Sequence, residues 1–339
     1  MKKLNLIFFF IFLTVIAAAQ SVRIVPVSLQ EDMRIFPHEG EDVIVYFPSV
    51  YLPYKTKINV VFPKDYDTKN GRFCSVYTLG SGEMPKNAVK EFFPREYADK
   101  CVFVNIRLNN IPSGDMLDQF LSKELLPYIE TNYKIEEDKS FKTLMSGEKY
   151  SSAVLEVLPA LSNYFGNFAG FFYHSTAVPD NLDGISADIS FFAAGRAENI
   201  ARLQFLFEQS GLKFYKNFAF KVVNVESSKM PDLKTVFNFE YIFNKNLCKP
   251  VKAKPIFSTD KASSTSEEPV TFWLAVKSKK TCGDLNYIPS KFKIAPPFLS
   301  WDYEEVSFKI IYGAQPGKVK ISGFAGDILP FDATFKITK

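Results

Sequence analysis

Histidine is scarce in this sequence: 2 residues among 339, beside 2 Trp and 4 Cys. Chemistry that needs an imidazole as a base or a metal ligand therefore has few residues to use. The cysteines are Cys74, Cys101, Cys248 and Cys282, and they lack the Cys-x-x-Cys spacing of a zinc site or redox motif. A phosphate-binding loop, a metal-ligand cluster and a dinucleotide fingerprint are also missing, so we expect no cofactor and no metal.

An excess of charge of one sign is missing as well. Lys+Arg 41 against Asp+Glu 37 gives a formal net charge of +4, and this small excess is scattered along the chain. Dedicated nucleic-acid binders concentrate basic charge on one face, so we do not expect nucleic acid as a partner. Hydrophobic residues make up 47% and charged residues 23%, which is a globular composition and excludes wholesale disorder.

The N-terminus has the parts of a secretory signal peptide. It begins with Lys2 and Lys3, continues mostly apolar over residues 4–16, and ends in the small residues Ala17 to Ala19. The apolar run is shorter than the roughly 20 residues of a spanning helix, and an uncleaved membrane anchor is the alternative. We expect residues 1–19 to be cleaved. The mature protein would then be secreted or periplasmic, at the cell envelope, with no membrane span.

An even number of cysteines in an exported protein suggests disulfide bonds, although four cysteines allow three pairings. Cys74 and Cys101 lie at the starts of two apolar runs. If these runs are neighbouring parallel strands in register, the two thiols lie side by side. We therefore favour the pairs Cys74–Cys101 and Cys248–Cys282. The alternative is four buried free thiols, which are common in protein cores.

Strand-like and helix-like segments alternate from residue 43 to residue 243. The expected strands are 43–47, 57–62, 73–79, 101–108, 141–145, 168–173, 189–193 and 218–225. The expected helices are 85–98, 115–132, 148–161, 197–210 and 233–243. Pro94 should end or kink the first helix, and Pro127 should bend the second. The alternation predicts an α/β domain over residues 20–243 with a mostly parallel sheet and flanking helices.

The composition changes after this region. Residues 244–269 are rich in Lys, Ser and Pro and are expected to be a linker. Residues 270–339 contain short apolar runs separated by Pro, Gly and Asp, which predicts a small all-β, sandwich-like domain. Trp301 and Tyr303 in this domain either stack on a sugar or pack in a core or interface, and packing is the simpler expectation.

Three sequence strings carry a resemblance to a known family. They are INVVFPKDY at 58–66, SVYTLG at 75–80 and FLSKELLPYIETNY at 120–133. Together with the order of segments, they resemble the branch of the α/β-hydrolases that includes enterochelin-esterase-like, feruloyl-esterase and esterase D proteins. The resemblance covers residues 57–243 and implies an α/β-hydrolase-like fold. It also implies a serine nucleophile, a histidine base and an acidic residue.

The expected catalytic residues are degenerate. In such enzymes the strand after the 120–133 helix ends in Gly-x-Ser-x-Gly. Here Ser146, Glu148 and Tyr150 take the positions of the first glycine, the nucleophile and the second glycine. Neither Ser146 nor Ser151 has glycines on both sides, so a shifted alignment does not restore the motif.

The base and the oxyanion hole are altered too. Ser227 falls at or near the histidine position of the family, whereas Glu198 keeps the place of the acid. His38 precedes the family-like region, and His174 follows the strand after the nucleophile position, where we expect a loop or strand-end residue. The resemblance would place oxyanion donors at Lys149 and in the loop with Gly80 and Ser81. That loop is equally typical of a tight strand-to-helix turn.

These residues lead to a main hypothesis and two alternatives. The first is an exported, catalytically inactive esterase-like protein that binds or scaffolds a protein or glycan partner at the cell envelope. The second is an active hydrolase of carboxylic esters or glycans with a non-standard site around Glu148, paired with Glu198 as carboxylates are in glycosidases. A surface ion pair of Glu148 with Lys149 is the structural alternative. The third is a purely structural envelope protein in which Tyr150 and Lys149 fill the old site.

Overall fold

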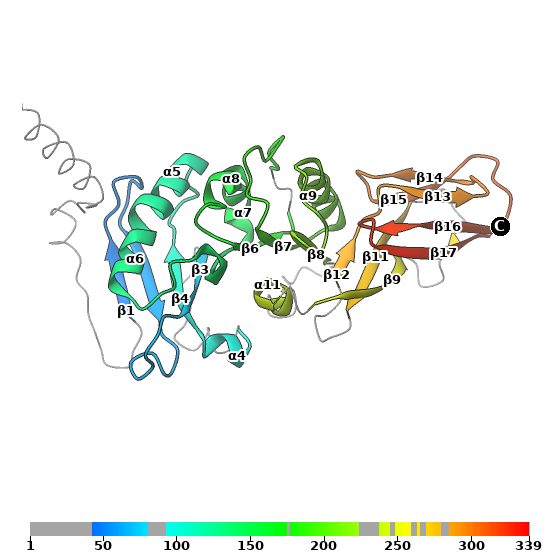
Figure 1. Ribbon diagram of the computed structural model, residues 1–339. Helices are drawn as coiled ribbons and strands as arrows, with labels where there is room; N and C mark the ends of the chain where they lie inside the picture. The colour runs from blue at the N-terminus through cyan, green and yellow to red at the C-terminus, as the bar shows by residue number, and fades with distance from the viewer. Residues whose placement is uncertain are drawn as a thin grey trace, which may run out of the picture.

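The computed structural model describes residues 43–80, 93–174, 177–223, 237–244, 248–258, 263–264, 269–278 and 285–338. In Figure 1 an α/β region and a strand-rich C-terminal region follow one another along the molecule. The expected signal peptide at residues 1–19 lies outside the described residues. Among the helices described, none combines the length and the apolar character that crossing a membrane requires.

The α/β region is built on one twisted sheet. Its strands are β1 (Val43–Phe47), β2 (Thr56–Val61), β3 (Cys74–Gly80), β4 (Cys101–Arg107), β5 (Lys142–Ser146), β6 (Asn167–Phe172), β7 (Ser190–Gly195) and β8 (Phe218–Val222). They lie in the order β1-β2-β4-β3-β5-β6-β7-β8. β1, β2 and β4 pair antiparallel, and each pairing from β4 to β8 is parallel. The expected α/β architecture with a mostly parallel sheet is confirmed.

Apolar side chains explain why the middle of this sheet forms. β5 and β7 are buried along their whole length, as strands covered by helices on both faces must be. The helices are α4 (Arg95–Ala98), α5 (Gly114–Gln119), η1 (Phe120–Leu125), α6 (Leu126–Asn132), η2 (Lys139–Phe141), α7 (Glu148–Glu156), α8 (Leu158–Leu161), α9 (Ala197–Gln209) and α11 (Phe239–Asn244). Because the runs of β5 and β7 are continuous and apolar, the sequence located the ends of these two strands to within two residues.

Pro94 and Pro127 both interrupt helices, as expected, but at Pro127 the interruption is a π-helical turn. α4 begins directly after Pro94, and residues 85–92 of the expected helix lie outside the described residues. The long helix runs through α5, η1 and α6, and the π-helical turn η1 ends just before Pro127. A proline lacks an N–H and crowds the carbonyl four residues before it. A wider turn just before the ring accommodates both effects.

The C-terminal region contains two sheets of mostly antiparallel strands. The strands are β9 (Pro250–Phe257), β10 (Ser263–Ser264), β11 (Val270–Ser278), β12 (Leu285–Tyr287), β13 (Phe292–Ala295), β14 (Leu299–Asp302), β15 (Ser307–Ile310), β16 (Gly317–Ala325) and β17 (Leu329–Ile337). One sheet has the order β10-β17-β16-β13, and the other continues the α/β sheet through β12. Rings of the two sheets meet, for example Phe257 and Phe335 with centroids 5.7 Å apart, as in a sandwich.

Two features of this region differ from the sequence expectation. β9 and β10 lie within residues 244–269, which were expected to be a linker. β9 was missed because its lysines and prolines hide the short apolar pattern that pairs it with β11. In addition, only the sheet β10-β17-β16-β13 is separate from the α/β sheet, because the other C-terminal sheet is joined to it where β12 pairs with β8 at Asn286↔Phe220.

The aromatic residues Trp301 and Tyr303 pack against other rings, as expected. The Trp301 ring lies 4.8 Å from the ring of Phe308, inside the C-terminal core. The Tyr303 ring lies 6.4 Å from that of Phe205 on α9, and its hydroxyl donates to the carbonyl of Ala201 at 3.2 Å. Tyr303 therefore belongs to the interface between the two regions.

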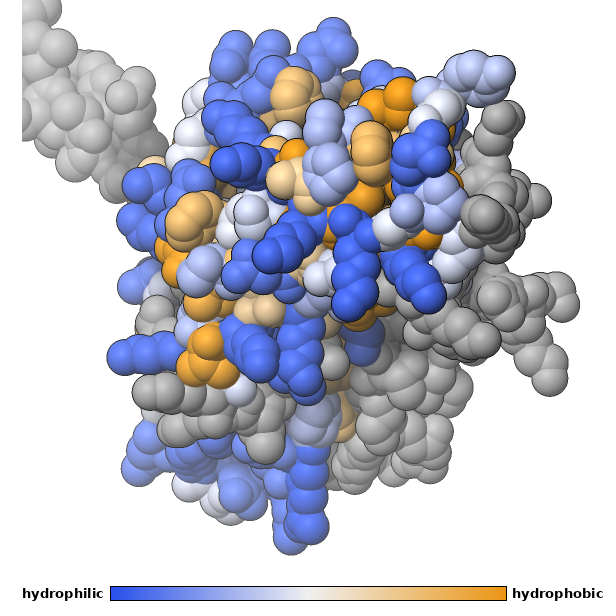
Figure 2. All heavy atoms as spheres, turned by 90° about the vertical axis from the view of Figure 1, so that its right-hand side faces the viewer, coloured by the Kyte–Doolittle hydropathy of each residue, from blue (hydrophilic) through white to orange (hydrophobic). Residues whose placement is uncertain are grey.

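Side-chain amides complete the junction between the regions. Asn286 Oδ1 accepts the N–H of Val222 at 2.7 Å, next to the single β8–β12 pair. The fully buried Gln204 of α9 donates to the carbonyl of Ile288 at 2.7 Å and accepts its N–H at 3.0 Å. Figure 2 views the molecule from the C-terminal end, where hydrophilic side chains predominate and hydrophobic ones show between them.

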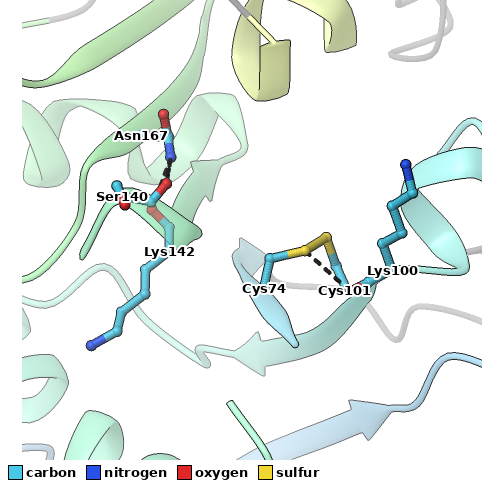
Figure 3. The surroundings of a disulfide bond; sticks show 6 residues. All are labelled: Cys74, Lys100, Cys101, Ser140, Lys142 and Asn167. Carbon is cyan, nitrogen blue, oxygen red and sulfur yellow. Dashed lines mark hydrogen bonds between the residues drawn. A yellow bond between two sulfur atoms is a disulfide. The ribbon is translucent and has the colours of Figure 1, made fainter. Parts of the chain in front are cut away.

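The cysteines of the α/β region form the predicted disulfide bond. Cys74 and Cys101 pair in register on the parallel strands β3 and β4, with their Cα atoms 4.6 Å apart (Figure 3). This confirms the prediction that rested on neighbouring parallel strands. Cys248 is also disulfide-bonded, and its predicted partner Cys282 lies outside the described residues.

Candidate functional site

The candidate site lies at the sharp turn between β5 and α7, which we call the elbow (residues 146–151). Gly147 is the single residue between the end of the strand and the first helical residue, Glu148. Its N–H donates to the carbonyl of Leu79 at the end of β3, at 3.2 Å. The neighbouring strand thus holds the turn in place, and the side chains that follow Gly147 start at the carboxyl edge of the sheet.

Two serine hydroxyls of the elbow lie inside the protein. The Oγ atoms of Ser146 and Ser151 are 2.9 Å apart, and both residues are buried. Ser151 also accepts the N–H of Phe171 on β6 at 3.2 Å. These hydroxyls are therefore part of the core, and they link β5, α7 and β6.

Tyr150 stands where the sequence resemblance places the second glycine of the motif. Its ring is 1% exposed, and its hydroxyl donates to the carbonyl of Leu108 at 2.8 Å. Leu108 directly follows β4, so this bond ties α7 to the end of a strand across the sheet. Lys149 is exposed beside it, with its ammonium 6.0 Å from the centre of the Tyr150 ring.

Glu148, which the sequence resemblance places at the nucleophile position, contacts His174. The carboxylate accepts the main-chain N–H of His174, and the same oxygen lies 2.6 Å from His174 Nδ1. The Glu148 side chain is 16% exposed and that of His174 is 74% exposed. A carboxylate in the first turn of α7 is also favoured by the positive end of the helix dipole.

The first turn of α9 fixes the segment that carries His174. Asn199, which is buried, donates its amide to the carbonyl of Phe172 at 2.9 Å and to that of His174 at 2.7 Å. The segment after β6 is thus held by hydrogen bonds from two elements, α9 through Asn199 and α7 through Glu148. His174 is a strand-end residue, as expected, and it also contacts Glu148 of the elbow, although the two residues are far apart in the sequence.

A cation and a second carboxylate lie near this pair. The Arg196 guanidinium lies over the Tyr173 ring, 4.5 Å from its centre. A hydrogen bond with the Tyr173 hydroxyl is the main cause that raises the pKa of Arg196. The negative charges of Glu198 and Glu148 raise this pKa further, so both carboxylates act on one guanidinium. Glu198 itself is exposed in the first turn of α9.

The structure thus brings together some of the expected residues. The negative charges of Glu148 and Glu198 both act on Arg196, and the carboxylate of Glu148 contacts His174 at the neighbouring strand end. Gly80 ends β3, and its carbonyl accepts the N–H of Leu108 at 3.0 Å. Ser81 and Ser227 lie outside the described residues. Within the residues described, no three His, Cys, Asp or Glu side chains are grouped so that they could hold a metal ion.

The missed contact has a signal in the sequence. Glu148 and His174 are 26 residues apart, but each follows the end of a strand in one parallel sheet. Neighbouring parallel strands end at the same edge, so the residues after β5 and β6 must lie close together. Counting strand ends would have placed His174 beside the elbow.

The fold is similar to those of solved esterase structures. The feruloyl esterase module of Clostridium thermocellum matches with a TM-score of 0.46 at 13% identity, over 63% of this chain and 93% of that chain. A ferulic acid esterase from the anaerobic fungus Anaeromyces mucronatus matches with a TM-score of 0.43 at 14% identity, over 62% and 90% of the two chains. An S-formylglutathione hydrolase from Staphylococcus aureus matches with a TM-score of 0.38 at 9% identity, over 56% and 91%.

No protein-family model matches the sequence, and no curated protein gives a significant match. The matched structures are esterases and related hydrolases at low sequence identity, and the similarity to them concerns the fold alone.

Proposed function

We propose that this is an exported esterase-like protein without esterase activity, which acts as a binding or scaffolding module at the cell envelope. The elbow is the observation that carries the proposal. Acyl transfer needs an accessible nucleophile beside a base. At the elbow the hydroxyls of Ser146 and Ser151 bond to one another in the core, and Tyr150 fills the place of a glycine.

Export is the second part of the proposal. It rests on the basic, apolar and small-residue segments of residues 1–19. The disulfide bond between Cys74 and Cys101 agrees with it, because such bonds persist mainly in exported proteins. A binding role suits a parallel sheet, because ligands commonly bind at the carboxyl ends of its strands. The loops after β5, β6 and β7 carry the polar residues of the candidate site.

One observation favours the alternative of an active hydrolase. The contact between Glu148 and His174 Nδ1 has the form of a carboxylate that orients an imidazole. An oriented imidazole can take a proton from water and so act as a general base. In this alternative His174 would be the base and Glu148 the positioning residue, and the substrate would be a carboxylic ester or a glycan.

An esterase assay decides between the two. The purified mature protein is mixed with a panel of short-chain and aromatic acyl esters, and the variants Glu148→Gln and His174→Gln are tested beside it. Glu156→Gln, an exposed residue at the other end of α7, is the matched control. We expect no turnover above buffer for any of the four proteins. Turnover that Glu148→Gln and His174→Gln abolish, and Glu156→Gln does not, would establish the active hydrolase.

Turnover that all variants retain would also contradict the proposal, because activity would then come from groups outside the elbow. To guard against misfolding, each variant is compared with the wild type by circular dichroism before the assay.

A further inference from the structure

One face of the sheet β10-β17-β16-β13 collects lysines that are far apart in the sequence. On β16 and β17 buried and exposed residues alternate, so every second side chain points to solvent. The register of β13, β16 and β17 then places on this outer face Lys293, Lys318, Lys320, Ser322, Phe324, Asp332, Thr334 and Lys336. We call this surface the lysine face. It arises because strand pairing gathers lysines that are scattered in the sequence.

Like charges stand directly opposite one another on this face. Lys318 and Lys336 are partners in the register of β16 and β17. Lys320, two residues along β16, is the diagonal neighbour of Lys336. Directly opposite side chains in antiparallel strands have Cβ atoms about 5 Å apart, and like charges there destabilise the sheet. The lysine face therefore carries a cost that folding alone does not explain.

Among the residues that the structure describes, little negative charge compensates these lysines. Within the described part of the chain, Lys293, Lys318, Lys320 and Lys336 form no ion pair, whereas Lys309 on β15 pairs with Asp302 and Glu305. Asp332 is the one carboxylate that the register places on the face, opposite Ser322. A surface with four ammonium groups and one carboxylate has a positive potential that attracts anions.

We propose that the lysine face binds an acidic polysaccharide. The face extends along β16 from Lys318 to Phe324, about 20 Å at the usual rise of a strand, which suits a polymer better than a small anion. Ser322, Asp332 and Thr334 offer hydrogen-bonding groups to sugar hydroxyls. Phe324 is 55% exposed at one end of the row and presents a ring on which a sugar can pack.

The other macromolecules fit this face less well. Protein interfaces are depleted in lysine, particularly at their centre. A surface that binds a membrane would expose more apolar side chains than Phe324 alone. The inference deepens the proposed binding role, on which it rests, since an exported protein meets envelope glycans and not nucleic acid.

Binding to polygalacturonate, a polymer of uronic acid, tests the proposal. Its fully methyl-esterified form has the same backbone without charge and serves as the ligand control. The protein variant is Lys318→Gln/Lys336→Gln. Its matched control is Lys213→Gln/Lys216→Gln, which removes two exposed lysines from the α/β region.

We expect the wild type to bind polygalacturonate and not its methyl ester, with an affinity that falls as salt rises. The Lys318→Gln/Lys336→Gln variant should lose about tenfold or more in affinity, by analogy with the loss of two charge contacts to a polyanion. The control variant should stay within about twofold of the wild type, since its lysines are outside the face. Phe324→Ala should weaken binding without changing the salt dependence, because its contact carries no charge.

Three results would overturn the proposal. The wild type fails to bind polygalacturonate even at low salt, or the double variant binds as well as the wild type. In the third, the wild type does not bind the polymer but binds phosphatidylglycerol vesicles, and the Lys318→Gln/Lys336→Gln variant does not bind them. The partner would then be an anionic membrane. Glutamine at these surface positions relieves the repulsion between Lys318 and Lys336, so the variant should melt at or above the melting temperature of the wild type. Ester turnover by the wild type would refute the proposed function and leave the binding result unaffected.

Discussion

The interior of the α/β region and its junction with the C-terminal region are held by different means. Within the α/β region, β3 pairs with β4 without a break from Cys74↔Cys101 to Gly80↔Arg107. At the junction, β8 and β12 share the single pair Asn286↔Phe220. The amides of Asn286 and Gln204 supply the hydrogen bonds that a longer ladder would otherwise make.

One continuous sheet thus contains strand pairs of two kinds, those joined by a long ladder of main-chain hydrogen bonds and one joined mainly by side chains. A ladder distributes its hydrogen bonds over many residues, whereas the junction concentrates them in a few side chains. Both tryptophans of the chain, Trp273 and Trp301, lie in the C-terminal region. Tryptophan fluorescence therefore reports on that region, while circular dichroism of the helices reports on the α/β region. Unfolding followed by both signals tests whether the two regions separate.

The largest effect is expected for Tyr150→Gly in the α/β region. The change empties the space of a buried ring and removes its bond to Leu108, so it should cost about 3–5 kcal/mol of unfolding free energy. Urea unfolding should show the helix signal lost before the tryptophan signal changes. Tyr150→Phe is the control, and it should cost about 1 kcal/mol because only the hydrogen bond is lost. Equal, small effects of both variants would mean that Tyr150 does not fill the elbow.

Removal of the disulfide bond should have the next largest effect. The bond between Cys74 and Cys101 closes a loop with a sequence separation of 27 residues. The chain-entropy estimate for such a loop is about 3–4 kcal/mol. Cys74→Ala/Cys101→Ala should therefore lower the urea midpoint, with the helix signal again leading. A midpoint equal to that of the wild type would show that β3 and β4 hold the loop without the bond.

The junction is tested by Gln204→Met, which keeps the size of the side chain. The change leaves both the N–H and the carbonyl of Ile288 buried without a partner, at a cost of about 2–3 kcal/mol. In this variant the tryptophan signal should change at a lower urea concentration than the helix signal, whereas in Tyr150→Gly the helix signal changes first. Arg202→Met, on the exposed side of α9, is the control and should unfold like the wild type. Coincident transitions in Gln204→Met would show that the junction is not a separate unit.

A smaller effect depends on pH and on Glu208, at the end of α9. Burial raises the pKa of this carboxyl, although the hydroxyl of Tyr287 donates to it at 2.9 Å and opposes the shift. The folded protein thus keeps the proton at a pH where the unfolded chain has released it. The stability due to this group is present below the unfolded pKa and is lost as the pH rises through the folded pKa.

Comparison with Glu208→Gln isolates this contribution from the other carboxyls. We expect the difference in melting temperature, wild type minus Glu208→Gln, to decrease as the pH rises from about 4 to 7. A difference that is constant over this range would contradict the raised pKa.

The sequence revealed the fold where apolar runs are continuous, and failed where the pattern is polar. β5 and β7 were found because each of their residues is buried. β9 was missed because its lysines face solvent between prolines. At the candidate site, Glu148 and Tyr150 were identified by their position after β5. Their partners His174 and Leu108 were not, because those contacts depend on which strands are neighbours.

The lysine face also could not be predicted from the sequence. Its lysines come from β13, β16 and β17, and the sequence does not contain the register that brings them together. A net charge of +4 spread along the chain is therefore compatible with a locally strong positive potential.

The disulfide bond has a consequence for where the protein becomes stable. A chain that is exported, as we propose, is made in a reducing compartment in which Cys74 and Cys101 stay as thiols. There the α/β region lacks about 3–4 kcal/mol of the stability that it has after oxidation. The bond joins β3 to β4 next to the strands that support the elbow, so the region would gain its full rigidity only at its destination. Stability would in this way be tied to location.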